Sequence, residues 1–295
     1  MNKATSGWMS GLIGVVIFSG SLPATRVAVM DFDPIFLTVA RATIAGILAF
    51  CLLFAFRERR PARGDLASLA VISLGVVVGF PLMTALALRH VTSAHSIVFI
   101  GLLPLATAIF GVLRGGERPR PTFWVFSGLG SAIVVGFAAR QGFSASPIGD
   151  LLMLAAIVAC GLGYAEGAKL SRRLGGWQVI CWALVLSLPV MTALMLATMP
   201  SSLAGPSAAS WLGFGYVSVF SMLIGFIFWY RGLALGGIVA VGQLQLLQPF
   251  FGLALASTLL GENVSWSMLA ATASWSMLAA TVAIVACVAG AKKFA

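Results

Sequence analysis

Two stretches of this sequence carry the same pattern: residues 104–117 read PLATAIFGVLRGGE and residues 249–262 read PFFGLALASTLLGE. In each, the glutamate of a Gly-Glu pair follows the proline by 13 residues. Upstream, Leu88 and Leu233 each stand 16 residues before their proline. Proline, glutamate and leucine at matched intervals indicate that the chain contains an internal repeat.

The interval that follows the two glutamates differs, and a second repetition accounts for the difference. Gly136 lies 19 residues after the first glutamate, whereas Gly290 lies 28 residues after the second. The segment Ser-Trp-Ser-Met-Leu-Ala-Ala-Thr occurs twice, at 265–272 and at 274–281, so one copy adds nine residues. Without that copy the second interval also becomes 19, which supports two related halves.

The composition excludes an ordinary soluble domain. Of the 295 residues, 60% are hydrophobic and only 9% are charged, whereas soluble domains carry about 25% charged residues. The mean hydropathy is +1.04. Because the apolar runs are continuous rather than alternating, they favour helices. We therefore predict an all-α polytopic membrane protein.

Ten apolar stretches are long enough to span a bilayer, since a hydrocarbon core of ~30 Å requires about 20 residues per helix. We assign five to each half, 1–145 and 146–295. An odd number of spans inverts the second half relative to the first, as in secondary transporters that bind their substrate in a central cavity at the repeat interface. The predicted spans are 8–29, 34–56, 66–88, 92–113, 122–139, 148–170, 177–199, 208–230, 237–260 and 264–291.

The basic residues orient the chain in the membrane. A net charge of +10 could suggest nucleic-acid binding, but the bases lie in short loops and follow the positive-inside rule better. We therefore expect no nucleic-acid partner and place both termini in the cytoplasm of an inner or plasma membrane protein. Alternate loops hold 14 Lys and Arg on one side (Lys3, Arg57, Arg59, Arg60, Arg63, Arg114, Arg118, Arg120, Lys169, Arg172, Arg173, Arg231, Lys292 and Lys293) against three on the other (Arg26, Arg89 and Arg140).

The sequence lacks the residue patterns for disulfide bonds, nucleotide binding and metal binding. Cys51, Cys160, Cys181 and Cys287 all fall inside apolar runs and read as small buried hydrophobic residues. The sequence has no nucleotide-binding G-x-x-x-x-G-K-[ST] motif and no cluster with metal-ligand spacing. We expect no cofactor, no metal and no enzymatic activity, but a lipid-embedded monomer that takes a small-molecule substrate.

Four groups of motifs occur together in one family of transporters. They are Pro34 with Arg41, the run from Pro104 through Gly116-Glu117 and Gly128 to Gly136, the segment Ser146-Pro-Ile-Gly-Asp150, and Gln248-Pro249 with Gly261-Glu262. On these motifs the whole chain resembles the EamA-type branch of the drug/metabolite transporter (DMT) superfamily. By general similarity, without a diagnostic motif, it resembles most of all the YddG-type amino-acid exporters of that branch. The resemblance implies ten helices around a central cavity lined by the first, third, fourth, sixth, eighth and ninth. The doubled segment departs from the family pattern.

Polar and aromatic residues near mid-depth are the candidates for substrate binding. The ninth span holds Gln243, Gln245 and Gln248 directly before Pro249, which frees a backbone carbonyl one turn earlier. Amides in hydrocarbon need partners, so these side chains either join helices or bind a ligand. Residues at similar depth would complete a mostly apolar pocket: Phe18, Ser19, Phe80, Met83, Phe99 and Tyr164.

Ionisable residues inside spans are functional hypotheses by default. For Arg41 we favour a structural role, bonded to loop carbonyls or to Asp31 and Asp33 at the outer rim, over binding of a substrate carboxylate. For Glu166 we favour a surface pair with Lys169, three residues later on the same helix, over a role in proton coupling.

Together these features predict export of small neutral or zwitterionic metabolites, above all amino acids including hydrophobic and aromatic ones, by alternating access. The alternative is multidrug or organic-cation efflux, although the first span lacks the carboxylate of small multidrug exporters. A polytopic membrane enzyme or a gated channel is less favoured. We expect no Lys or Arg at mid-depth of the cavity. Proton coupling is expected to be loose, with Glu166 and His95 as the candidate groups.

Overall fold

The computed structural model describes residues 3–91, 96, 99–139, 146–248, 251–252, 255, 286 and 290. These residues form helices and contain no strand. Within them, six helical stretches are long and apolar enough to cross a membrane: Lys3–Asp31, Pro34–Ala55, Arg63–Ala87, Pro147–Leu174, Gly176–Ala197 and Ala208–Gly236. Of the predicted tenth span only residues 286 and 290 are described, and the doubled segment lies outside the described residues.

Two helices form the first span, and a capped proline starts the second. α1 (Lys3–Ser19) and α2 (Ser21–Asp31) meet at Gly20. α3 (Pro34–Ala55) begins after Asp33, whose carboxylate accepts hydrogen bonds from the first free backbone N–H groups of the helix. Proline at the first helical position costs no hydrogen bond, because its missing N–H would have no partner within the helix. Asp33 as the cap and Pro34 as the first helical residue therefore set the start of α3.

The third and eighth spans share an irregularity. In the third, a π-helical segment separates two α-helices: α4 (Leu66–Ile72), η2 (Ser73–Gly79) and α5 (Phe80–Ala87). In the eighth the order is α11 (Ala208–Gly215), η3 (Tyr216–Ile224) and α12 (Gly225–Gly236). The repeated prolines, Pro104 and Pro249, are 145 residues apart. Adding 145 to the residue numbers of η2 gives 218–224, which lies inside η3. π-Helical turns occur frequently at functional sites.

The remaining described elements are three long helices and four shorter pieces. Short apolar pieces represent the fourth and ninth predicted spans, because parts of both lie outside the described residues. These elements are η1 (Arg63–Asp65), α7 (Leu103–Leu113), α8 (Pro121–Ala139), α9 (Pro147–Leu174), α10 (Gly176–Ala197), α13 (Ile238–Gly242) and η4 (Gln243–Leu247).

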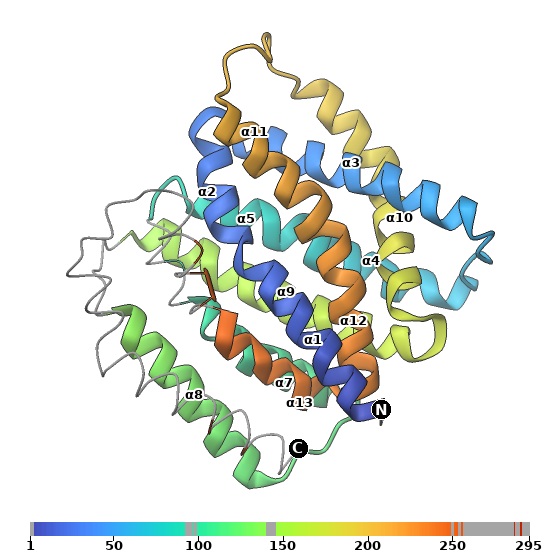
Figure 1. Ribbon diagram of the computed structural model, residues 1–295, viewed down its shortest axis with the longest axis vertical. Coiled ribbons are helices and arrows are strands. Elements are labelled where there is room, and N and C mark those ends of the chain that lie inside the picture. Colours follow the sequence, from blue (N-terminus) through green and yellow to red (C-terminus); the bar gives the residue numbers. More distant parts are fainter. Residues whose placement is uncertain are drawn as a thin grey trace.

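Helices from distant parts of the chain lie side by side (Figure 1). α1 runs along α12, α3 along α10, and α9 contacts both α5 and α7. The α1–α12 contact depends on glycine: a Cβ atom on Gly232 would lie 2.6 Å from the backbone nitrogen of Gly11, and one on Gly7 equally close to that of Gly236. Small residues at these positions let the two backbones touch.

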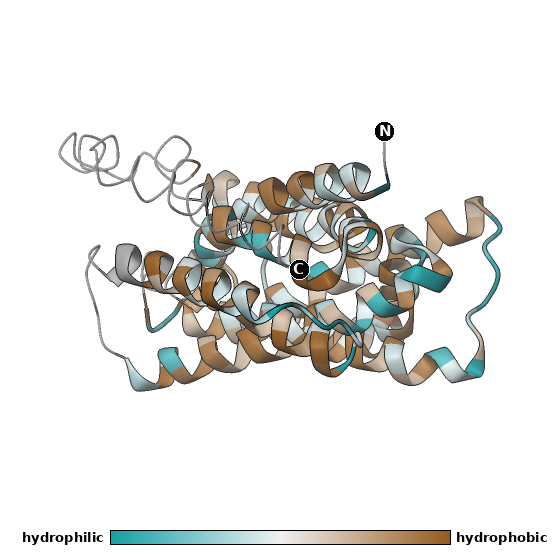
Figure 2. Cartoon of the chain, turned by 90° about the horizontal axis from the view of Figure 1, so that it is seen from below, coloured by the Kyte–Doolittle hydropathy of each residue, from teal (hydrophilic) through white to brown (hydrophobic). Residues whose placement is uncertain are grey.

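Polar contacts connect the loops at each of the two ends of the helices. At one end, which we call the Glu117 end, Glu117 pairs with Arg172, and Asp65 pairs with Arg173. At the other, the Asp31 end, Asp31 accepts a hydrogen bond from the backbone nitrogen of Ser207. Figure 2 shows hydrophobic residues along the helices and hydrophilic residues largely in the connections.

Candidate substrate-binding site

A small cavity lies inside the molecule among helices from both halves of the sequence. Its volume is about 20 Å³, room for about one water molecule. The larger hollows open at the surface; one of about 460 Å³, for example, lies among the loops at the Asp31 end. The small cavity is lined by Phe18, Ser21, Leu22, Thr25, Arg41, Phe80, Thr84, Leu103, Tyr164, Ser221, Phe226 and Gln248.

Aromatic rings form one wall of this cavity. The ring of Phe18 meets that of Phe226 edge to face, with centroids 5.0 Å apart, and Tyr164 meets Phe226 at 5.9 Å. Behind them, Trp229 lies 5.4 Å from Tyr164. Such pairs are stabilising beyond the area that they bury. Phe80 lines the same cavity, so the structure brings together three of the aromatic residues predicted for the substrate site.

The other predicted small and aromatic residues lie elsewhere. Ser19 is buried and its hydroxyl donates to the carbonyl of Val15, one turn back, at 2.7 Å. Phe99 packs against the main buried core. Neither they nor Met83 are among the cavity-lining residues. The other predicted coupling residue, His95, lies outside the part of the chain that the structure describes.

The three glutamines are all buried but face different surroundings. The Nε2 of Gln243 lies 3.5 Å from a carbonyl of its own helix, and that of Gln245 donates to the hydroxyl of Thr107 at 3.3 Å. Gln248 Nε2 donates to the carbonyl of Phe18 at 3.4 Å, which ties the ninth predicted span to the first. Among the described residues the Oε1 atom of each lacks a hydrogen-bond partner, and of the three only Gln248 lines the cavity. The set therefore makes helix-joining contacts and leaves three unpaired acceptors, one of them on a residue that lines the cavity.

Arg41 lies in the cavity wall, so our expectation of a rim contact is wrong. The carboxylate of Asp31 accepts hydrogen bonds from Ser207 and Ser210 instead, while that of Asp33 caps α3. No ion pair among the described residues includes Arg41. α3 thus lines the cavity in addition to the helices that the family resemblance implies as its lining. The cavity therefore carries a fixed positive charge, which we did not expect.

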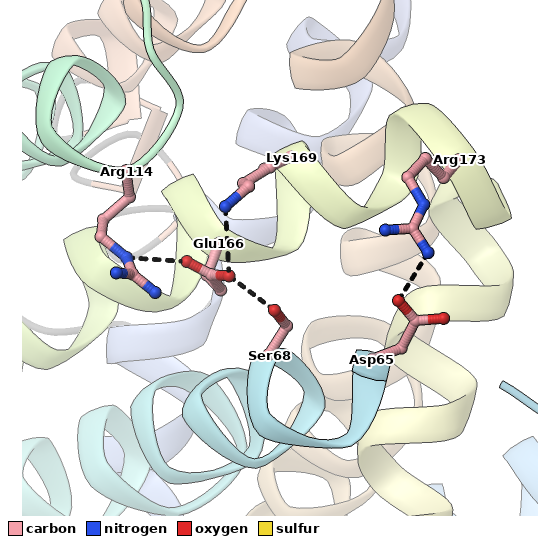
Figure 3. A network of polar contacts seen from close by, with 6 residues as sticks. All are labelled: Asp65, Ser68, Arg114, Glu166, Lys169 and Arg173. Carbon is pink, nitrogen blue, oxygen red and sulfur yellow. Dashed lines mark hydrogen bonds and ion pairs between the residues drawn. The ribbon is translucent and has the colours of Figure 1, made fainter. Parts of the chain in front are cut away.

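The expected ion pair of Glu166 with Lys169 forms, but the carboxylate is buried and not at the surface, and it has closer partners (Figure 3). Its side chain is 1% exposed, and Oε2 lies 3.0 Å from Nε of Arg114 on the end of α7. Oε1 accepts a hydrogen bond from Ser68 Oγ of α4 at 2.6 Å, whereas Lys169 Nζ is 4.0 Å away. This carboxylate therefore holds α9 to two other helices, which a spacing within one helix cannot reveal.

The glutamate of the first repeated motif has a structural task that the sequence did not suggest. Glu117 accepts hydrogen bonds from the backbone nitrogens of Ile238 and Val239, at 2.8 and 2.7 Å, and pairs with Arg172. These nitrogens are the unsatisfied donors at the start of α13. A carboxylate there also meets the positive end of the helix dipole. Glu117 therefore caps a helix of the other half of the chain.

Comparisons with known proteins match this chain to transporters. The model of the EamA-like transporter family matches residues 5–138 and again 147–289. The "Uncharacterized transporter YdeK" of Bacillus subtilis (strain 168) is 65% identical over 295 residues, all of both chains. The "Probable terminal-alkyne amino-acid exporter" of Streptantibioticus cattleyicolor is 23% identical over 85% of this chain and 84% of its own.

The fold also has a counterpart among solved structures. One crystal structure matches 98% of this chain and 99% of its own, with a TM-score of 0.76 and 21% identity. At that identity the likeness concerns the arrangement of the helices alone. Among the described residues, no group of three or more His, Cys, Asp or Glu side chains could hold a metal ion.

Proposed function

The chain belongs to the EamA-like transporter family, and from that premise we propose that it exports small zwitterionic metabolites, amino acids above all, by alternating access. One observation carries the substrate class: a cavity with aromatic walls, lined by Gln248, whose buried amide oxygen has no partner among the described residues. Apolar walls with a few fixed polar atoms are typical of small-molecule sites. An unpaired acceptor suits the ammonium group of an amino acid.

The similarity to the Streptantibioticus cattleyicolor protein, whose name is that of an amino-acid exporter, supports the same substrate class. The aromatic side chains favour substrates with hydrophobic or aromatic side chains. An organic cation fits the cavity less well, because it would lie beside the guanidinium of Arg41.

The size of the cavity supports a closed state within a transport cycle. A volume of about 20 Å³ cannot hold an amino acid. Substrate binding therefore requires the surrounding helices to separate. The π-helical segments η2 and η3 directly precede Phe80 and Gly225 in the two helices that flank the cavity, and we propose that these irregular turns absorb the movement.

We propose a ten-span topology with two inverted halves, 1–145 and 146–295, in the cell membrane. The family match in two consecutive parts and the shared π-helical segments support it. The Glu117 end carries most of the described loop bases and is the proposed cytoplasmic side. Both termini would then be cytoplasmic, and the chain would function as a monomer without a cofactor.

The experiment that tests the function is counterflow of radiolabelled amino acids into proteoliposomes. Purified protein is reconstituted with each unlabelled amino acid inside, and uptake of its labelled form is measured against protein-free liposomes. We expect accumulation of several hydrophobic or aromatic amino acids. Transport of organic cations without any amino acid would replace this proposal by multidrug efflux, and hydrolysis of a labelled lipid would replace it by an enzyme.

A further inference from the structure

We propose that Arg41 binds the carboxylate of the transported substrate inside the cavity, an inference that rests on the proposed function. Arg41 is the eighth residue of α3, about 10 Å from the start of the helix at a rise of 1.5 Å per residue. Its side chain is only 6% exposed. The guanidinium is therefore held inside the protein instead of reaching the membrane surface.

No ion pair among the described residues includes the Arg41 guanidinium. Within this part of the chain, its Nε is a buried donor without a hydrogen-bond partner. The carboxylates nearest in sequence, Asp31 and Asp33, are engaged with loop serines and with the N-terminus of α3. A buried unpaired charge is costly, so a site that retains one has a use for it. An arriving carboxylate would supply the missing partner through charge-assisted hydrogen bonds.

The remaining lining residues restrict the class of anion. Of the described residues around the cavity, Arg41 alone is charged. One guanidinium matches one carboxylate, whereas a phosphate with two charges would require a second base. The hydroxyls of Ser21 and Ser221 already bond each other at 2.7 Å, and that of Thr84 bonds the carbonyl of Phe80. Gln248 Oε1, which has no partner among the described residues, is an acceptor for an ammonium group and would complete recognition of a zwitterion.

The first arm of the test uses the wild-type protein alone. Counterflow of labelled L-phenylalanine and L-leucine is inhibited with the unlabelled acid, its carboxamide and the amine that lacks the carboxylate. Because an ion-paired carboxylate contributes more than a neutral contact, we expect the amide and the amine to inhibit at least about tenfold less well. Equal inhibition by acid and amide would overturn the inference while leaving amino-acid transport intact.

The second arm removes the guanidinium. In Arg41→Gln we expect the apparent affinity for the acid to fall about tenfold or more, with little change for the amide, so that discrimination disappears. Arg41→Lys keeps the positive charge and should retain part of the discrimination between acid and amide. Thr43→Val is the matched control, because Thr43 is buried in the same helix and its hydroxyl bonds only the carbonyl of Val39.

The outcomes separate the two proposals. No counterflow of any amino acid by the wild type would refute the proposed function and this inference together. Transport with unchanged discrimination in Arg41→Gln would refute the inference alone. If Arg41→Gln does not fold, Arg41→Lys and the wild-type analogue series decide: weaker discrimination in the lysine variant supports the inference, and discrimination equal to that of the wild type contradicts it.

Discussion

Glu117 Oε1 accepts a hydrogen bond from the backbone nitrogen of Ile238, 121 residues later in the chain, at 2.8 Å. The Gly-Glu motif at residues 116–117 therefore joins two distant parts of the chain. Glu117 has a second bond, to Val239, and an ion pair with Arg172. Its loss would leave the first donors of α13 without their acceptor.

We predict that Glu117→Ala lowers the melting temperature of the purified protein by on the order of 5 °C, since two charge-assisted bonds are lost. Arg172→Met is the control that removes only the ion pair. The Arg172 side chain is 39% exposed, so solvent screens that pair and a much smaller change is expected. Equal effects of the two variants in a thermal unfolding assay would contradict the cap.

Glu166 provides a prediction about coupling. In Glu166→Gln the amide can still accept a hydrogen bond from Ser68, and Arg114, with 49% of its side chain exposed, stays solvated. We therefore expect counterflow within about twofold of the wild-type rate, given the modest value of a half-exposed pair. Measurements with and without an imposed pH gradient check this. A wild-type requirement for the gradient that Glu166→Gln abolishes would make Glu166 the coupling group.

The glycine contact between α1 and α12 predicts a position-dependent effect of one substitution. Gly232→Val places a side chain against the backbone of Gly11, where a Cβ would lie only 2.6 Å from the nitrogen. We expect strong loss of folded protein in size-exclusion profiles, because overpacking costs about 1–3 kcal/mol or more. Gly215→Val is the control, since a Cβ there meets nothing within 4 Å. Similar profiles for both variants would mean that the contact is dispensable.

The topology can be tested by cysteine labelling on a background without the four native cysteines. Ser202→Cys lies in the loop at the Asp31 end, and Arg118→Cys follows Glu117 at the other end. We expect a membrane-impermeant maleimide to label Ser202→Cys on intact cells and Arg118→Cys only after the membrane is opened. Labelling of both from the same side would refute the proposed arrangement.

The doubled segment predicts a tolerated deletion, although it lies outside the described residues. As a helix, the 28 residues of 264–291 would be ~42 Å long against a hydrocarbon core of ~30 Å. Deleting residues 265–273 restores the 19-residue interval between glutamate and glycine. We expect expression and counterflow close to those of the full chain. Loss of either in the deletion variant would contradict the repeat alignment.

Part of the cavity could be predicted because helical geometry is local. Phe18, Ser21, Leu22 and Thr25 lie at intervals of three, four and seven residues, which places them on one helix face. Of these four residues, only Phe18 is among those predicted for the substrate site. Aromatic residues at the same depth, such as Tyr164, could be chosen for the same reason. A periodicity indicates which side chains share a face, but not what faces them.

The sequence by itself determined the class of protein, its family and the helix positions near Pro34 and Pro147, because bilayer thickness and proline geometry act on contiguous residues. Only the tertiary structure decided the environments of its charges. Arg41 and Glu166 are both ionisable residues inside predicted spans. Neighbouring helices supply Glu166 with Arg114, whereas Arg41 lines a cavity and has no ion-pair partner among the described residues. The partner of a buried charge comes from another part of the chain, so local spacing cannot specify it.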